Sequence, residues 1–175
     1  MPQSLVPADS IWTWEQADGS SLQVSWQCHA DTSEQAQNRN TPSIVLVHGF
    51  GASSHHWRHN LPVLGNHTPT YALDLIGFGG SSQPQALLIG EQPAIDQADC
   101  SKALVYSFDL WGQQVADFCT AIVQGPVLLV GNSIGGVVAL RAAQLLKDNC
   151  QGVVLIDCAQ RLMDDKQLAT QPAWM

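Results

Sequence analysis

Short apolar runs alternate with polar stretches along the chain, and they predict strands rather than long helices. Six such runs stand at residues 12–15, 22–27, 44–47, 70–73, 127–130 and 152–156. The first two flank Asp18-Gly19, a dipeptide typical of tight hairpin turns. Residues 44–47, 127–130 and 152–156 are rich in Val, Ile and Leu, which is typical of strands buried on both faces of a parallel sheet.

Helical spacing appears in two longer segments. Between residues 108 and 123, apolar side chains recur at Leu110, Val115, Phe118 and Ile122. Residues 137–146 are largely apolar and predict a buried helix. Strands that alternate with helices predict an α/β fold with a mostly parallel, doubly wound sheet. The polar segment 30–42 and the proline-containing segment 83–102 predict irregular excursions.

Composition narrows the classes of partner. The chain has 7 Lys and Arg against 15 Asp and Glu, and only 13% of its residues are charged. A net charge of −8 argues against nucleic acid or an anionic membrane surface as partner. No apolar stretch approaches the ~18 residues of a transmembrane helix, and the first ten residues lack the pattern of a secretory signal. We therefore expect a protein that is not secreted.

The five cysteines are odd in number and widely spaced, at positions 28, 100, 119, 150 and 158. They form no Cys-x-x-Cys pair and no His/Cys ligand spacing. We expect them to be small buried hydrophobic residues in a reducing, cytoplasmic compartment, with no metal site.

The most informative motif is Gly131-Asn132-Ser133-Ile134-Gly135-Gly136, directly after the apolar run 127–130. Gly-x-Ser-x-Gly between a strand and a helix is typical of a nucleophile elbow, a turn so sharp that it needs glycine two residues either side of the serine. Ser133 is thus the candidate nucleophile, with Gly131 and Gly135 as structural positions. The alternative is a glycine-rich turn whose serine only caps the helix.

Two upstream motifs point the same way. His48-Gly49-Phe50-Gly51 follows the strand at 44–47, and an Asp-x-x-Gly-x-Gly-x-Ser loop begins at Asp74. Together with the elbow, they resemble the α/β-hydrolase superfamily. That resemblance implies an oxyanion hole made by the backbone N–H groups of Phe50 and Ile134, and structural roles for His48, Gly49 and Asp74.

Softer matches at residues 56–62, 106–118 and 131–140 resemble the plastid and cyanobacterial hydrolases related to pheophytinase and chlorophyll dephytylase. This resemblance implies cleavage of a carboxylic ester that carries a bulky hydrophobic group, with a small hydrophobic ester as substrate. It implies no metal and no organic cofactor, and a plastid or cyanobacterial interior as an alternative location.

The catalytic partners of Ser133 are missing from this sequence. The superfamily orders its triad as serine, acid, histidine, yet the last of the six histidines is His67. We expect residues 11–160 to be the N-terminal part of one domain with strands one to six of eight, and residues 161–175 to begin a cap. The triad acid and histidine would then follow Met175, and the 175-residue chain alone would be inactive. Asp157 is the alternative acid, because a minority of the family carry theirs after this strand.

Two other functions stay open. Carbon–carbon bond hydrolases of ring-fission products share the Gly-Asn-Ser-x-Gly-Gly elbow, and some proteins of this fold bind ligands without turnover. Close to the oxyanion loop, His55 and His56 either line a pocket mouth or are exposed loop residues. Trp57 either forms an apolar wall for substrate or packs under the loop.

Overall fold

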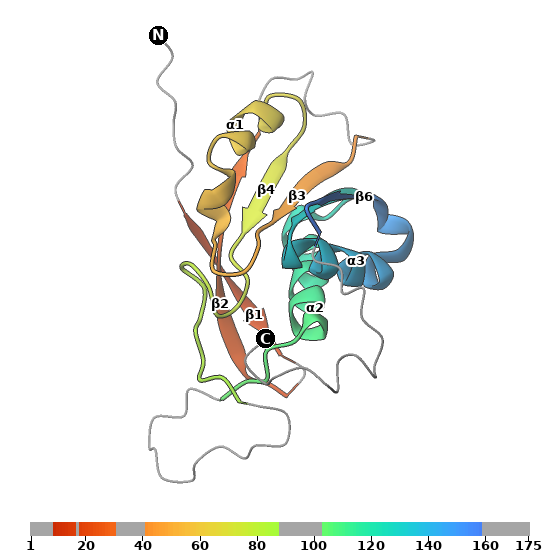
Figure 1. Cartoon of the computed structure of the whole chain (residues 1–175). Helices are drawn as coiled ribbons and strands as arrows, with labels where there is room; N and C mark the ends of the chain where they lie inside the picture. Colours follow the sequence, from red (N-terminus) through yellow and green to blue (C-terminus); the bar gives the residue numbers. More distant parts are fainter. Residues whose placement is uncertain (1–8, 17, 31–40, 88–102, 159–175) are drawn as a thin grey trace, which may run out of the picture.

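The computed structural model describes residues 9–16, 18–30, 41–87 and 103–158, which form one twisted sheet with helices on both faces (Figure 1). The strands of these residues are β1 (Ser10–Glu15), β2 (Ser21–His29), β3 (Ser43–Val47), β4 (Thr70–Leu73), β5 (Val127–Asn132) and β6 (Cys150–Ile156). Their order across the sheet is β1-β2-β4-β3-β5-β6. β3 to β6 run parallel, whereas β1 and β2 are antiparallel to their neighbours. This confirms the mostly parallel α/β sheet predicted from the pattern of apolar runs.

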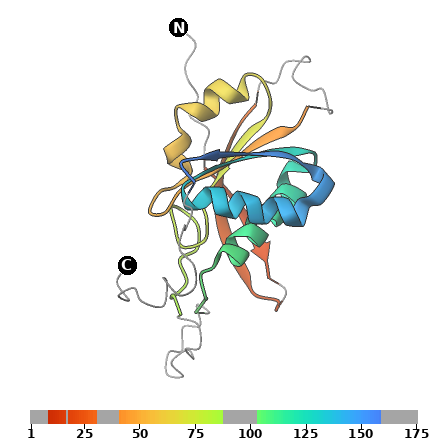
Figure 2. The ribbon, with the colours of Figure 1, turned by 45° about the vertical axis from the view of Figure 1, so that its right-hand side comes forward.

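The helical elements are η2 (Ser54–Trp57), α1 (Asn60–Gly65), α2 (Phe108–Phe118), η3 (Cys119–Val123), α3 (Ile134–Leu146) and η4 (Lys147–Asn149). α1 covers one face of the sheet, and α2 and α3 cover the other (Figures 1 and 2). The segment around His55 was predicted as a loop, so α1 was missed. Its buried residues Leu61 and Gly65 are four apart, the spacing of one helix face.

Alternation along β3 divides the core between the two faces. Val45 and Val47 lie in the larger core, beneath α2 and α3. Leu46 points the other way and packs with Trp57 and Leu61. A strand places successive side chains on opposite faces, so a run of apolar residues is required where both faces are covered.

α2 begins with a side-chain cap and continues at its C-terminus into a π-helical turn. The Ser107 side chain accepts a hydrogen bond from the backbone N–H of Leu110 at 3.1 Å, which satisfies one of the free donors of the first turn. Its last turn widens into the π-helical η3, which ends at Gln124 in the left-handed conformation. α2 lies close to α3 at Gly112. A Cβ atom at this position would lie only 2.8 Å from Cβ of Arg141. The adjacent Arg141–Asp109 ion pair, 2.6 Å long, is exposed.

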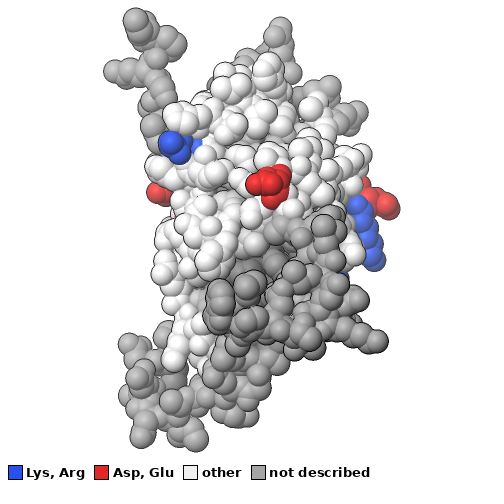
Figure 3. All heavy atoms as spheres, viewed as in Figure 1, with Lys and Arg blue, Asp and Glu red and all other residues white. Residues whose placement is uncertain are grey.

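The surface in Figure 3 carries few charges, in keeping with the composition. Among the cysteines of the described residues, Cys119 is buried, and burial raises the pKa of its thiol to about 12. Cys28, Cys150 and Cys158 are only half-buried, so the expectation of buried cysteines is met in part. None of the helices within the described ranges is both long and apolar enough to cross a bilayer. Cys100, most of the two predicted irregular segments and the predicted cap at 161–175 lie outside the described residues.

Candidate active site

Ser133 occupies the turn between β5 and α3 in a strained backbone conformation. Its φ and ψ are 54° and −122°, a region that residues with a side chain rarely adopt. Its N–H donates to the carbonyl of Ile156 at 3.0 Å, and its own carbonyl accepts from the N–H of Gly136 at 3.0 Å. Hydrogen bonds on both sides therefore hold the strained residue in place.

The turn is tight enough to require glycine on either side of Ser133. A Cβ atom at Gly131 would collide with the carbonyl group of Gly135. A Cβ atom at Gly135 would stand 2.5 Å from the carbonyl oxygen of His48, closer than real Cβ contacts. The end of β5, the start of α3 and the end of β3 thus meet with no room for side chains.

The loop after β3, predicted to be the oxyanion loop, lies directly against the turn at Ser133, the predicted elbow. A Cβ atom at Gly49 would lie 3.2 Å from Cβ of Ser133 and 3.3 Å from the carbonyl oxygen of Asn132. Phe50 follows with its side chain 76% exposed, and Gly51 takes a φ of 68°. Ile134 is the first residue of α3. The fold therefore brings the loop that contains Phe50 beside Ser133, although 83 residues separate the two in the sequence.

His48 is fully buried, and hydrogen bonds occupy both of its ring nitrogens. Nδ1 lies 2.7 Å from the carbonyl oxygen of Gly49, and Nε2 accepts from the backbone N–H of Leu75 at 3.0 Å. The carbonyl can only accept, so the proton sits on Nδ1 and the ring is neutral. Burial lowers the pKa of His48 below its ordinary value. The ring ties the loop after β3 to the loop after β4.

Asp74 binds two further loop segments. Its carboxylate accepts from the backbone N–H of Ser54 at 2.5 Å and from that of Gly80 at 2.7 Å. Its carbonyl oxygen accepts from the hydroxyl of Ser81 at 2.7 Å. The glycine loop and the start of η2 are therefore anchored to one residue at the end of β4.

Sequence reasoning missed Gln114, the fully buried glutamine of α2. Its Nε2 donates to the carbonyl of Asp74 at 3.0 Å, and its Oε1 accepts from the N–H of Ile76 at 3.0 Å. A signal was present, because Gln114 stands four residues from both Leu110 and Phe118 on the apolar face of the predicted helix. A polar side chain on such a face is expected to have buried partners.

His55, His56 and Trp57 of η2, whose roles the sequence left open, have different surroundings in the structure. Trp57 is only 4% exposed and packs in the core beneath α1, so it does not form a wall for substrate. His55 lies near Gln27 of β2, with 3.4 Å between Nδ1 and Nε2. His56 instead reaches the elbow, where its Nε2 lies 3.1 Å from Nδ2 of Asn132.

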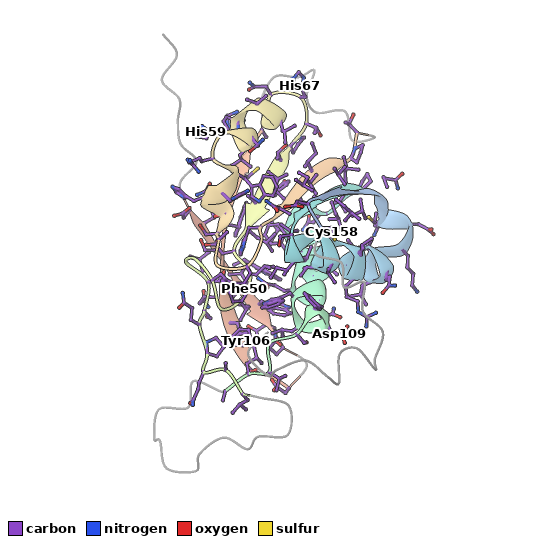
Figure 4. The ribbon with its side chains drawn as sticks, viewed as in Figure 1. Phe50, His59, His67, Tyr106, Asp109 and Cys158 are labelled. Atoms are coloured by element: carbon purple, nitrogen blue, oxygen red, sulfur yellow. The ribbon has the colours of Figure 1, made fainter. Side chains whose placement is uncertain are left out.

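A row of aromatic rings extends from the loop after β3 to the start of α2, and Figure 4 labels two of its members, Phe50 and Tyr106. Phe50 contacts Phe78 edge-on, with ring centroids 5.4 Å apart. Phe78 leads to Trp111 at 5.9 Å, which in turn contacts Tyr106 and Phe108, each at 6.1 Å. The row thus leads from the exposed Phe50 through the buried Trp111 to Phe108 at the start of α2.

Asp157 follows β6 next to the elbow, since Ile156 pairs with Asn132. It is exposed and has a φ of 45°. Among the described residues, no cluster of three or more His, Cys, Asp or Glu side chains is arranged to hold a metal ion.

Comparison with known proteins identifies the family. The model of the alpha/beta hydrolase fold matches residues 42–175, and the chain belongs to that family. The chain is 31% identical over 139 residues to the chloroplastic pheophytinase of Arabidopsis thaliana, a match that covers 69% of this chain and 28% of that protein. It is 29% identical over 120 residues to 2-hydroxy-6-oxo-6-(2'-aminophenyl)hexa-2,4-dienoic acid hydrolase of Metapseudomonas resinovorans, covering 66% of this chain and 35% of that protein.

A solved structure agrees with this assignment. The crystal structure of a membrane phospholipase A, described as a bacterial virulence factor, superposes with a TM-score of 0.63 at 28% identity. The match covers 89% of this chain and 42% of that one. The chain thus spans about a third of the length of the two curated relatives above.

Proposed function

We propose that Ser133 is the nucleophile of a serine hydrolase that cleaves a carboxylic ester with a bulky hydrophobic group. The observation that carries this proposal is the strained backbone of Ser133, φ 54°, held at the β5–α3 junction against Gly49. Strain of this kind costs about 1–3 kcal/mol and persists where the surrounding structure enforces it, often at functional sites. A serine that only capped α3 would not need it, and Ser133 makes no side-chain cap hydrogen bond.

In the proposed mechanism, Oγ of Ser133 attacks the ester carbonyl carbon while a general base takes its proton. The carbonyl oxygen becomes an oxyanion, which the backbone N–H groups of Phe50 and Ile134 stabilise with the positive end of α3. The tetrahedral intermediate collapses, and the alcohol leaves with the proton from the base. Water then hydrolyses the acyl-enzyme by the same steps, which releases the acid and restores Ser133.

The general base of this proposal is not His48, because both of its ring nitrogens are occupied and its pKa is lowered by burial. The proposal therefore concerns a longer protein, on the scale of the relatives, that supplies a histidine and a carboxylate. Asp157 is the alternative acid within this chain, since it lies at the end of β6 beside the elbow.

The aromatic row supports an apolar substrate group. Phe50, the residue after Gly49, is 76% exposed, and Phe108 at the other end of the row is 44% exposed. Burial of apolar surface against them would favour a long acyl or isoprenoid chain over an acetyl group. The identity to chloroplastic pheophytinase supports the same substrate class.

A carbon–carbon bond hydrolase is the second candidate. Two observations favour it: the Gly-Asn-Ser-Ile-Gly-Gly elbow and the identity to a hydrolase whose name gives a 2-hydroxy-6-oxo-hexadienoic acid as substrate. Turnover of a vinylogous ring-fission diketone, with none of an ester, would select this function instead.

The direct test is covalent labelling of the full-length protein with a fluorophosphonate. The wild type should be labelled, Ser133→Ala should not, and Ser21→Ala, an exposed serine of β2, should be labelled like the wild type. Circular dichroism of Ser133→Ala should match the wild type. Labelling that persists in Ser133→Ala would overturn the assignment, and a complete lack of labelling in the wild type would favour a protein that binds ligands without turnover.

A further inference from the structure

The two N–H groups of the proposed oxyanion hole lie past the ends of β3 and β5, where the sheet's hydrogen bonds no longer set the distance between the two segments. β3 and β5 pair in parallel, and their last paired residues are Val47 and Gly131. Phe50 and Ile134 each follow that pair by three residues. Additional contacts must therefore hold the two segments in register past the last rung of the ladder.

A side-chain hydrogen bond spans this gap. The Nδ2 amide group of Asn132, the residue before Ser133, lies 3.1 Å from Nε2 of His56. An amide NH₂ group can only donate, so Nε2 accepts and the imidazole proton is on Nδ1. His56 belongs to η2, the element that follows the oxyanion loop. The bond thus links the far end of that loop to the elbow.

The face on which this bond forms follows from strand alternation. Val130 packs in the core with Trp57, and Asn132, two residues further along β5, points to the same face. His56 contacts the buried Trp57 edge-on, with ring centroids 5.1 Å apart. The imidazole is thereby supported on a residue that is itself fixed in the core, although its own surface is exposed.

We propose that His56 is a positioning residue of the hydrolase. Its bond to Asn132 holds the elbow against η2 and so sets the distance between the N–H groups of Phe50 and Ile134. This inference rests on the proposed function of Ser133. His56 does not touch the reacting atoms in this role; it acts through the backbone of Asn132.

A loss of this bond should slow the chemical step more than substrate binding. The apolar surface at Phe50 does not depend on it, whereas donors in an oxyanion hole act only when they are correctly placed. A net hydrogen bond contributes on the order of 1 kcal/mol, which corresponds to a rate effect of about fivefold.

The experiment uses the full-length protein with His56→Ala, His56→Gln and the matched control His55→Ala. Glutamine places a hydrogen-bonding group close to the position of Nε2. We measure kcat and KM for a 4-nitrophenyl ester, the rate of fluorophosphonate labelling, and Tm. His56→Ala should lower kcat and the labelling rate about fivefold, with KM unchanged and Tm lowered by no more than about 4 °C. His56→Gln should recover most of the loss, and His55→Ala should resemble the wild type.

A double-mutant cycle gives a second reading. Asn132→Ala should reproduce the loss in His56→Ala, and the double variant should be no slower than either single variant. The inference is overturned if His56→Ala behaves like His55→Ala, if the loss appears in KM or in Tm but not in kcat, or if the two substitutions are additive. Those outcomes leave Ser133 labelled, whereas an unlabelled wild type would overturn both this inference and the proposed function.

Discussion

Gly135 and His48 lie so close together that a Cβ atom at position 135 would stand 2.5 Å from the carbonyl oxygen of His48. The first turn of α3 therefore presses against the end of β3, where the oxyanion loop begins. His48 in turn holds that loop through Gly49 and Leu75. The turn at Ser133 and the loop after β3 thus form one packed unit.

This close approach predicts how the two elbow glycines respond to a single added methyl group. Gly131→Ala and Gly135→Ala should each lower the free energy of unfolding by about 1–3 kcal/mol or more, because backbone atoms would have to move. Gly125→Ala is the matched control, since a Cβ atom there meets nothing within 4 Å. Urea unfolding of the full-length protein measures the effect. Equal stability of all three variants would show that the turn is more open than described.

Replacement of Gln114 should lower the free energy of unfolding, although this buried residue has no proposed contact with substrate. Gln114→Ala would leave the buried N–H of Ile76 without its partner, whereas the carbonyl of Asp74 would keep its bond from the hydroxyl of Ser81. An unsatisfied buried group costs about 1–3 kcal/mol, so the free energy of unfolding should fall by about that amount. Gln113→Ala removes only an exposed hydrogen bond to Asp117 and should change stability by less than about 0.5 kcal/mol. Similar values for the two variants would contradict the buried role of Gln114.

His48 predicts a loss of stability on acidification. Its pKa is lowered in the folded state, whereas an unfolded histidine has a pKa of about 6.5. Below about pH 6.5 the unfolded chain therefore binds more protons, and the free energy of unfolding falls as pH falls, by at most about 1.4 kcal/mol per pH unit for this group. Above that pH the ring is neutral in both states and contributes nothing.

His48→Gln retains an acceptor for the N–H of Leu75 but cannot titrate, so it is the matched variant. Unfolding free energies measured from pH 8 to pH 5 should fall more steeply for the wild type than for His48→Gln. Parallel curves would mean that His48 does not carry this pH dependence.

The aromatic row predicts a preference for long substrates in the full-length protein. We expect kcat/KM to be higher for a 12-carbon 4-nitrophenyl ester than for the acetyl ester. Phe50→Ala should reduce this preference, the quotient of the two kcat/KM values, about tenfold, because the ring of Phe50 is exposed next to Gly49. Val63→Ala removes an apolar side chain that is 60% exposed on α1 and serves as the control. Equal rates on both esters in the wild type would refute an apolar substrate site.

The 175-residue chain expressed alone is expected to be poorly soluble and to show no Ser133-dependent turnover. Within the described part of the chain, β6 is an edge strand, and Val154, Leu155 and Ile156 are each more than 40% exposed. Exposed apolar edges promote aggregation. Size-exclusion chromatography and an esterase assay against Ser133→Ala check both points. A monodisperse, Ser133-dependent esterase would place the base among the six upstream histidines.

The sequence alone determined the strands, the two long helices and the position of the tight turn between β5 and α3. These features depend on neighbours within a few residues: the apolar run before Ser133, the glycines at 131 and 135, and the repeat along α2. Each strand of the sheet lies where a short apolar run predicted it, and β4 coincides with residues 70–73. The roles of Ser133, Phe50 and Ile134 stay predictions until the labelling experiment is done.

Only the tertiary structure decided which distant residues meet. Asn132 and His56 are 76 residues apart, and Gln114 and Asp74 are 40 apart. Their contacts exist because β3 lies between β4 and β5, an order that no local pattern encodes. The same order buried Trp57 under α1 and left Phe50 exposed, although both follow the same strand within ten residues. Local spacing fixes the direction in which a side chain points from its own helix or strand. The packing of elements from distant parts of the chain decides which residues that side chain contacts.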